Sequence, residues 1–428
     1  MKNICFYFQV HQPMRLKKYR FFQIGQDHYY YDDFQIEEQI RAAAEQSYLP
    51  ANRTIAEMIR SSNGKFKCAF SISGVVLEQL EQYAPEVIDS FRELAATGSV
   101  EFLAEPYAHS LSSVFDADEF EMQVNLHADL IATLFGKRPT VLRNSELVYS
   151  DEIGDIAQKM GFKTMLVEEA KHVLGWKSPN FLYTHAFNSK LKLLIRNLKL
   201  SEDIFMRFSN PSWTDFPLTA EKFTGWIAST PPDEKLFNIW MGYEALGISQ
   251  RFETGIFEFL KAVPYHAMEQ KISFVLPSEA GKKLEPAGNL SVPFPTSWWG
   301  LEKDLSPWNG NDLQAEALQK LYSVGQRVRM CNDKPLLHDW LMLQTSEHFR
   351  FMSHKFAYGS HYESPYDAFM NYMNVLSDFL ERVEAQYPTT IDNEELNELL
   401  KTINHQEKEI ATLEEEIKQL RSRKAKKV

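Results

Sequence analysis

Short apolar segments alternate with amphipathic stretches along the first two thirds of the chain. Eight segments, each followed by polar residues, have the pattern of buried strands: 4–10, 66–72, 100–104, 140–143, 163–167, 191–195, 236–241 and 272–276. Helical periodicity runs through four of the stretches between them: 75–97, 117–135, 151–160 and 251–262. Strands that alternate with helices are typical of parallel β/α units, so we expect an α/β fold.

Polar side chains follow most of these predicted strands. His11 follows the first strand, and carboxylates follow five of the others: Glu105, Glu146, Glu168 with Glu169, Glu244 and Glu279. In a β/α barrel such positions converge on the carboxyl-terminal face, where active sites lie. The pattern therefore predicts one polar site built from six strands.

The pattern changes after residue 283. Residues 284–312 are rich in proline, glycine and tryptophan, which disfavours long regular elements. Amphipathic helices are expected beyond them, at 313–330, 335–353 and 366–385. We therefore predict three parts: a barrel over 1–283, a loop and helical region over 284–388 that completes the cleft, and a tail over 389–428.

The tail carries a heptad repeat. Its a positions are Leu396, Ile403, Ile410 and Ile417, and its d positions are Leu399, Gln406, Leu413 and Leu420. Such a seam favours a coiled coil, and we predict a parallel homodimer through residues 394–420. A helix that folds back on the body of the protein is the alternative. The basic end, RSRKAKKV, is interpreted as a solvated helix end.

Composition limits the classes of partner. A chain of 428 residues with 44% hydrophobic content can bury a large core, and its net charge of −12 argues against binding to nucleic acid or anionic membranes. No segment approaches the roughly 20 apolar residues of a membrane helix. Cys5, Cys68 and Cys331 are too few and scattered for a disulfide framework or a structural zinc site. With no signal-peptide pattern, we expect a cytoplasmic protein that binds a neutral ligand and needs no metal or cofactor.

Two early segments contain candidate site residues. FQVHQP places His11 at the end of the first strand, although a lone histidine there is more often a hydrogen-bonded core residue. GSVEFLAEPYAHSLS brings Glu101, Glu105 and His109 within nine residues. These three form either part of a binding site or a set of structural ion pairs.

Two later segments add charged groups next to apolar ones. LRNSELVYS places Arg143 and Glu146 at the end of the fourth strand, where the arginine either neutralises the carboxylate or keeps it ionised as a nucleophile. LQTSEHFRFMS sets Glu347 and His348 in an apolar helix. Buried charge is costly, so a partner or a function must hold them there.

Tryptophans in the 284–312 loop suggest a sugar ligand. Trp298, Trp299 and Trp308 could stack their flat faces on glucose rings. The alternative is that they only fill the mouth of the barrel, because large aromatic side chains are often buried.

The chain resembles glycoside hydrolase family 57, most closely its α-amylase and α-amylase-like members. The five signature regions of that family can be traced in order, as FQVHQP, GSVEFLAEPYAHSL, LRNSELVYS, IWMGYEALG and LQTSEHFRFMS. The resemblance implies an incomplete (β/α)7 barrel followed by a helical region, one strand fewer than the pattern predicts. It also implies an α-glucan or maltooligosaccharide substrate.

The resemblance assigns the catalytic positions. It makes Glu146 the nucleophile of a retaining mechanism, whereas Gly242 occupies the position of the general acid, normally an aspartate. Glu244 still matches the family and has a binding role there. Because general acid catalysis contributes about 10²–10⁴-fold, the glycine predicts feeble hydrolysis of natural glucans unless another carboxylate, such as Glu244 or Glu279, replaces the acid.

Three hypotheses follow. The first is a weakly active or altered α-glucan hydrolase or transferase, and the second is a noncatalytic α-glucan-binding protein that recruits partners through its tail. The third, and least favoured, is a metal-dependent enzyme like a polysaccharide deacetylase or an α-mannosidase. That enzyme would require histidines such as His11, His109 and His348 to meet in space.

Overall fold

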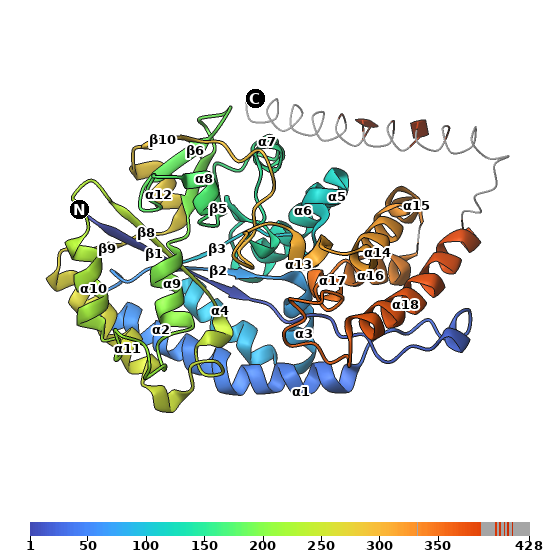
Figure 1. The fold of residues 1–428 in the computed structure, drawn as a ribbon, viewed down its shortest axis with the longest axis horizontal. Coiled ribbons are helices and arrows are strands. Elements are labelled where there is room, and N and C mark those ends of the chain that lie inside the picture. The colour runs from blue at the N-terminus through green and yellow to red at the C-terminus, as the bar shows by residue number, and fades with distance from the viewer. Residues whose placement is uncertain are drawn as a thin grey trace, which may run out of the picture.

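The structure is a computed structural model that describes residues 1–331 and 333–386, together with seven single positions between 399 and 413. It has an α/β fold with two sheets surrounded by helices (Figure 1). The first sheet is centred on β1 (Asn3–Val10), which pairs in parallel with β2 (Cys68–Ile72) and β8 (Leu236–Gly242). The short strands β3 (Val100–Phe102) and β9 (Ser273–Phe274) pair with β2 and β1.

The second sheet has the order β10-β6-β7-β5-β4. Its strands are β4 (Val141–Arg143), β5 (Thr164–Val167), β6 (Leu182–His185), β7 (Lys192–Ile195) and β10 (Gly288–Leu290), and β6 runs antiparallel to β7. Two isolated parallel bridges connect the sheets, Ala104 with Leu142 and Arg196 with Asn238. All eight predicted segments contain a strand. The eighth forms only the two-residue β9, and β6 and β10 were not expected.

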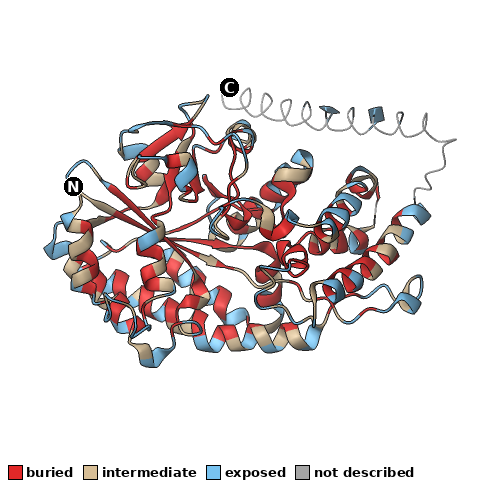
Figure 2. Cartoon of the chain, in the orientation of Figure 1, coloured by how far each residue is buried: buried red, intermediate tan, exposed pale blue. Residues whose placement is uncertain are grey.

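Alternate residues of β1 enter two different cores. Phe6 and Phe8 belong to the large cluster that packs against the helices. Tyr7, on the opposite face, belongs to a smaller cluster that includes Leu194 of the second sheet and Trp240 of β8. Because side chains alternate along a strand, this smaller cluster marks the space enclosed between the two sheets. Figure 2 shows the strands buried along most of their length.

Helices cover the outer faces of the strands. Those of the first 283 residues are α1 (Asp33–Ala43), α2 (Leu49–Ser61), α3 (Gly74–Tyr83), α4 (Pro85–Ala96), α5 (Ser112–Phe115), α6 (Ala117–Phe135), α7 (Asp151–Lys159), α8 (Lys171–Leu174), α9 (Leu198–Phe205), α10 (Ala220–Ser229), α11 (Ile256–Glu269) and α12 (Pro277–Lys283).

The predicted helix 117–135 has the bounds of α6, because Asp116 caps its start and Gly136 ends it in a left-handed conformation. The predicted helix 75–97 is wrong as one element. Pro85 begins a second helix there, since proline disfavours helical geometry in the residue before it.

The remaining helices gather beside the ends of β1 and β2 (Figure 1). They are α13 (Ser306–Asn309), α14 (Asp312–Tyr322), α15 (Gly325–Met330), α16 (Lys334–Leu343), α17 (Ser346–Arg350) and α18 (Pro365–Gln386). Two of the three helices predicted here are each split, into α14 with α15 and α16 with α17, and α18 matches the third. Contacts of α14, α16 and α17 with α18 make these helices one packed group.

A long segment after β1 is fixed to this group by Asp378 of α18. The Asp378 carboxylate accepts hydrogen bonds from the backbone N–H of Gly25 at 2.6 Å and the hydroxyl of Tyr30 at 2.5 Å, and it lies 2.9 Å from Nδ1 of His28. The carboxylate is fully buried. One side chain therefore holds three points of the segment against α18.

Three a and d positions of the predicted heptad seam lie outside the described residues: Leu396, Ile417 and Leu420. Of the five described a and d positions, Leu399, Ile403, Ile410 and Leu413 are helical and 42–56% exposed, and Gln406 is also helical and exposed. The coiled coil and the homodimer remain predictions. Across the part of the chain that the structure describes, no helix combines the length and apolar character needed to cross a bilayer.

Candidate active site

Glu146 lies at the centre of a buried polar cluster just after β4. Its carboxylate is held from three sides. Trp298 donates its indole N–H to Oε2 at 2.5 Å, the hydroxyl of Ser346 donates to Oε1 at 2.8 Å, and Nε2 of His109 lies 3.5 Å from Oε1. Only 3% of Glu146 is exposed. Its φ of 55° is left-handed, a conformation that non-glycine residues adopt rarely and often at functional sites.

His109 connects Glu146 to a second carboxylate. Nδ1 of His109 lies 3.0 Å from Oε2 of Glu105, and Nη1 of Arg143 lies 3.5 Å from the same oxygen. Arg143 also donates from Nη2 to Oε1 of Gln9 at 2.6 Å, and Nε2 of Gln9 lies 3.2 Å from Nε2 of His109. Residues in or after β1, β3 and β4 therefore form one continuous network.

The charges in this network support each other. Burial by itself favours the neutral ring, yet Glu105 and Glu146 raise the pKa of His109 to about 9. Burial also opposes ionisation of both carboxylates. Even so, His109 and Arg143 lower the pKa of Glu105 to about 2, and His109 and Trp298 lower the pKa of Glu146 below its ordinary value. Glu146 is therefore ionised at neutral pH, as a nucleophile must be.

His11 and Glu347 adjoin the cluster from β1 and α17. The His11 ring stacks on His109 with 4.1 Å between centroids, and its Nε2 lies 3.2 Å from Oε2 of Glu347. One ligand atom from each of His11, His109 and Glu347 lies within 4.8 Å of the others, a spacing that a metal ion could bridge.

Trp298 joins the cluster to β8. Its ring packs on Trp240, with 4.9 Å between centroids, and on Trp299, with 4.5 Å. Trp299 is half-buried and lies under the guanidinium of Arg350 at 5.1 Å. Trp240 is on the same face of β8 as Gly242, because the two are two positions apart and alternate residues of a strand share a face. Position 242 therefore faces the side of the sheet on which Glu146 lies.

Glu244 lies beside Gly242 at the end of β8. A Cβ built on Gly242 would stand 3.6 Å from Oε2 of Glu244, an ordinary van der Waals contact. The other oxygen, Oε1, accepts hydrogen bonds from the hydroxyl of Tyr48 and from Nε2 of Gln12, the latter at 3.3 Å. Burial of the carboxyl raises the pKa of Glu244 to about 7, although those two donors lower it. Gly242 and Glu244 are both partly exposed.

Three predicted site residues lie elsewhere. Glu101 accepts from the backbone N–H of Ser278 at 3.0 Å, and Nε2 of His348 lies 3.1 Å from the carbonyl of Met342. Trp308 has no exposed surface and packs in the main core. These placements match the structural alternatives for buried charge and aromatic residues more closely than contact with a ligand.

Sequence reasoning missed four polar partners. Ser346 and Gln12 stand next to Glu347 and His11 in the signature regions, and Gln9 precedes His11 by two positions, so adjacency to a motif could have found them. Tyr48 follows α1 in a segment without any signal in the sequence. Its role depends entirely on tertiary packing.

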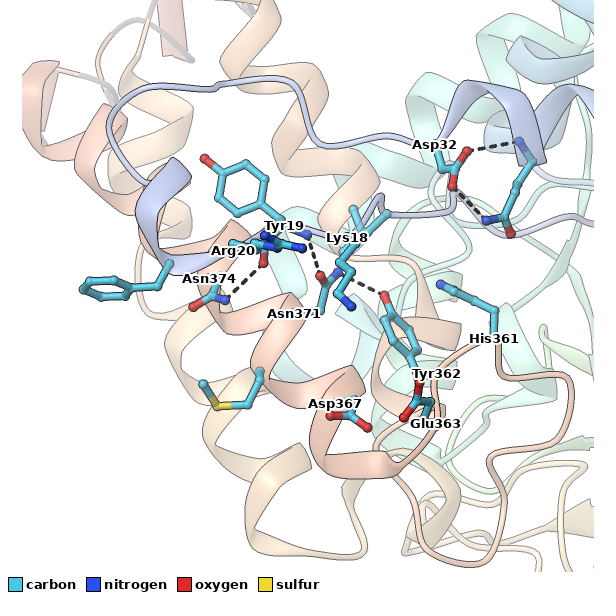
Figure 3. Close-up of a pocket in the computed structure, with 14 residues that line it drawn as sticks. Lys18, Tyr19, Arg20, Asp32, His361, Tyr362, Glu363, Asp367, Asn371 and Asn374 are labelled. Atoms are coloured by element: carbon cyan, nitrogen blue, oxygen red, sulfur yellow. Dashed lines mark hydrogen bonds between the residues drawn. The ribbon is translucent and has the colours of Figure 1, made fainter.

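A cavity of about 530 Å³ lies between the segment after β1 and α18 (Figure 3). Asn371 lines this cavity, but its side-chain amide is already hydrogen-bonded to the protein backbone. It accepts from the backbone N–H of Tyr19 at 2.7 Å and donates to the carbonyl of Lys17 at 3.1 Å. None of the residues that line it belongs to the Glu146 cluster. This cavity is separate from the candidate active site.

Comparison with known families decides the class of the protein. Residues 5–293 match the sequence pattern described as Glycosyl hydrolase family 57. The chain belongs to this family. A protein of Methanocaldococcus jannaschii named as a candidate alpha-amylase is 38% identical to this family 57 chain, over 88% of this chain and 84% of the relative. An alpha-amylase of Pyrococcus horikoshii is 23% identical, over 61% of this chain and 41% of the relative.

Solved structures of two enzymes share the fold. The branching enzyme of Pyrococcus horikoshii superposes with a TM-score of 0.65 at 16% identity, over 94% of this chain and 94% of that one. The 4-alpha-glucanotransferase of Thermococcus litoralis gives a TM-score of 0.63 at 17% identity, over 81% of this chain and 56% of that one. This family 57 chain thus spans little more than half the length of the glucanotransferase.

Proposed function

We propose that this family 57 protein acts on α-glucans or maltooligosaccharides by a retaining mechanism in which Glu146 is the nucleophile. The observation that carries the proposal is the Glu146 carboxylate itself: buried, oriented by Trp298 and Ser346, and kept ionised by His109. Carboxylates in such surroundings are candidates for catalysis rather than for stability, because burial of an ionised group is otherwise costly.

The chemistry proceeds in two displacements. Glu146 attacks the anomeric carbon and forms a glycosyl ester while the glycosidic C–O bond breaks. Water then attacks the same carbon, the ester bond breaks, and Glu146 is released as a carboxylate. This water gives up a proton, which replaces the proton that the leaving oxygen took up when the C–O bond broke. If a sugar hydroxyl replaces water in the second step, the product is a transferred glucan.

The proposed architecture is an incomplete barrel. The bridges between Ala104 and Leu142 and between Arg196 and Asn238 support a ring in the order β1-β2-β3-β4-β5-β7-β8, which would be a (β/α)7 barrel. In this proposal residues 1–283 form the barrel and residues 284–388 cover its face, where Trp298 and Ser346 reach Glu146.

Six further residues are proposed to bind substrate around Glu146. They line the network or its tryptophan side and carry donors, acceptors or flat faces suited to a sugar: His11, Glu105, His109, Arg143, Trp299 and Glu347.

A noncatalytic α-glucan-binding protein is the second candidate. Gly242 favours it, because the family position of the general acid has no side chain. The two functions separate on α-maltosyl fluoride, whose fluoride leaves without acid assistance. A nucleophile at Glu146 predicts turnover of this substrate by the wild type and none by Glu146→Gln. A pure binding protein does not turn over α-maltosyl fluoride, but it still binds maltooligosaccharides in calorimetry. Stoichiometric zinc in the purified protein would instead favour the metal-dependent alternative.

A further inference from the structure

We propose that Glu244 replaces the missing proton donor. The general acid of this site would then lie two residues after position 242, its position in the family. This inference rests on the proposed function, since a donor has a role only if Glu146 attacks a glycosidic carbon. It gives Glu244 a direct part in bond cleavage in addition to any role in binding.

The first argument is position. The contact of 3.6 Å between Oε2 of Glu244 and a Cβ at residue 242 means that the carboxyl reaches back into the space beside the glycine. Gly242 pairs with Gln9 across β8 and β1, and the Gln9 amide lies 3.2 Å from the imidazole of His109, next to Glu146. Two side chains thus separate position 242 from the nucleophile.

The second argument is the orientation of the proton. Tyr48 and Gln12 both donate to Oε1 of Glu244, so Oε1 acts as an acceptor. When the carboxyl is protonated, the hydrogen belongs on Oε2, the oxygen that lies against Gly242. The side chain therefore presents its proton beside position 242, the family position of the acid.

The third argument is the state of the neighbouring carboxylates. Although burial opposes it, positive partners lower the pKa of Glu105 to about 2 and hold the pKa of Glu347 far below its ordinary value. Burial also opposes ionisation of Glu279, but its ion pair with Lys67 at 2.8 Å helps to lower its pKa below the ordinary value. By contrast, burial raises the pKa of Glu244 to about 7, which suits a group that gives up and regains a proton near neutral pH.

The proton balance is complete. In the first step Glu244 gives its proton to the glycosidic oxygen, which leaves as a neutral hydroxyl with the electron pair of the broken C–O bond. In the second step the Glu244 carboxylate takes a proton from the attacking water as the Glu146 ester breaks. Both carboxyl groups return to their starting states.

The test compares Glu244→Gln with the wild type on maltooligosaccharides and on α-maltosyl fluoride. We expect kcat/KM for maltooligosaccharides to fall by about 10²–10⁴-fold. The first displacement on the fluoride, followed as the burst of fluoride release, should persist because it needs no acid. Azide needs no general base, so it should restore turnover of the fluoride by the variant and yield α-maltosyl azide. The exposed Glu253 provides the matched control, since Glu253→Gln should leave both rates unchanged.

Each outcome assigns a failure to one claim. Suppose that Glu146→Gln loses turnover of the fluoride, whereas Glu244→Gln hydrolyses maltooligosaccharides as fast as the wild type. This result overturns the inference about Glu244 but supports the proposed function. Wild-type turnover of the fluoride without any turnover of maltooligosaccharides does the same. If Glu146→Gln retains full activity on the fluoride, the proposed function itself fails. A misfolded Glu244→Gln would not respond to azide, so the rescue separates a catalytic role from a structural one.

Discussion

His109 and Glu146 face each other across 3.5 Å, and both have left-handed backbones, with φ of 53° and 55°. Each such residue costs on the order of 1–3 kcal/mol and persists only where the surrounding structure enforces it. Here the strain places an imidazole against a buried carboxylate at the end of two different strands. Replacement of either residue should therefore disturb the site directly.

Replacement of His109 should change the pH dependence of catalysis. The His109 cation lowers the pKa of Glu146, and Glu146 must be ionised to attack. In His109→Asn, which tolerates the positive φ, we expect the acidic limb of kcat/KM for α-maltosyl fluoride to move upward by roughly 1–3 pH units. The exposed His172 provides the control, since His172→Asn should leave the limb in place. A lower rate with an unmoved limb would restrict His109 to substrate binding.

Trp298 contributes to the same ionisation from the other side. Trp298→Phe keeps most of the packing against Trp240 but removes the N–H that donates to Oε2 of Glu146. A hydrogen bond to a charged group contributes about 1.5–3 kcal/mol, so the acidic limb should again move to higher pH. The rate at pH 5 should fall more than the rate at pH 7. Trp176, which is 93% exposed, offers the matched Trp→Phe control. Equal losses at both pH values would contradict the prediction.

Asp378 provides a test of stability away from the site. Burial raises its pKa, but Tyr30, His28 and the Gly25 N–H more than compensate, so its pKa lies below the ordinary value. A depressed carboxyl pKa stabilises the fold above the unfolded-state pKa and loses that contribution as the pH falls through the folded-state pKa. We expect Asp378→Asn to lower the free energy of unfolding at pH 7 by about 1–3 kcal/mol in urea titrations.

The difference between wild type and Asp378→Asn should shrink below about pH 4, the region of an ordinary aspartate pKa. Asp89→Asn, at an exposed ion pair with Arg92, should change stability by less than about 1 kcal/mol at either pH. A difference for Asp378→Asn that does not depend on pH would show that its ionised form is not what holds the segment after β1.

The heptad seam predicts a dimer. A chain that ends at Asn393 should be a monomer, with about half the particle mass that light scattering gives for the full-length dimer. Ile410→Lys should also give a monomer, because it places a charge in the seam. Thr412→Lys, at a heptad position outside the seam, is the control. If the truncated chain has the same number of subunits in solution as the full chain, the coiled-coil prediction is wrong.

The alternation of strands and helices was readable from the sequence because strands of a parallel sheet are buried on both faces and appear as short apolar runs. β6 and β10 were missed for a physical reason. They lie at one edge of the second sheet, and Gly288 and Asn289 of β10 carry little apolar surface. The helix break at Pro85 is encoded in the sequence, because proline disfavours helical geometry in the residue before it.

The site was only partly predictable. Glu105, His109, Arg143 and Glu146 follow adjacent strands, so strand topology alone brings them together. Tyr48 reaches Glu244 from a helical segment about 200 residues away in the chain, and no local pattern encodes that contact. Trp308 was predicted to contact a ligand but is buried, because the sequence of a loop does not show whether its tryptophan faces a ligand or fills the core.

The central claim is that Glu146 attacks the sugar. It is tested most directly by trapping the glycosyl-enzyme with an α-maltosyl fluoride that carries a second fluorine on carbon 5 of the reacting glucose, which slows the second displacement. Intact mass spectrometry followed by peptide mapping should find one fluoromaltosyl group per chain, attached to Glu146 and absent from Glu146→Gln. An adduct on any other carboxylate, or no adduct while the fluoride is turned over, would contradict the account.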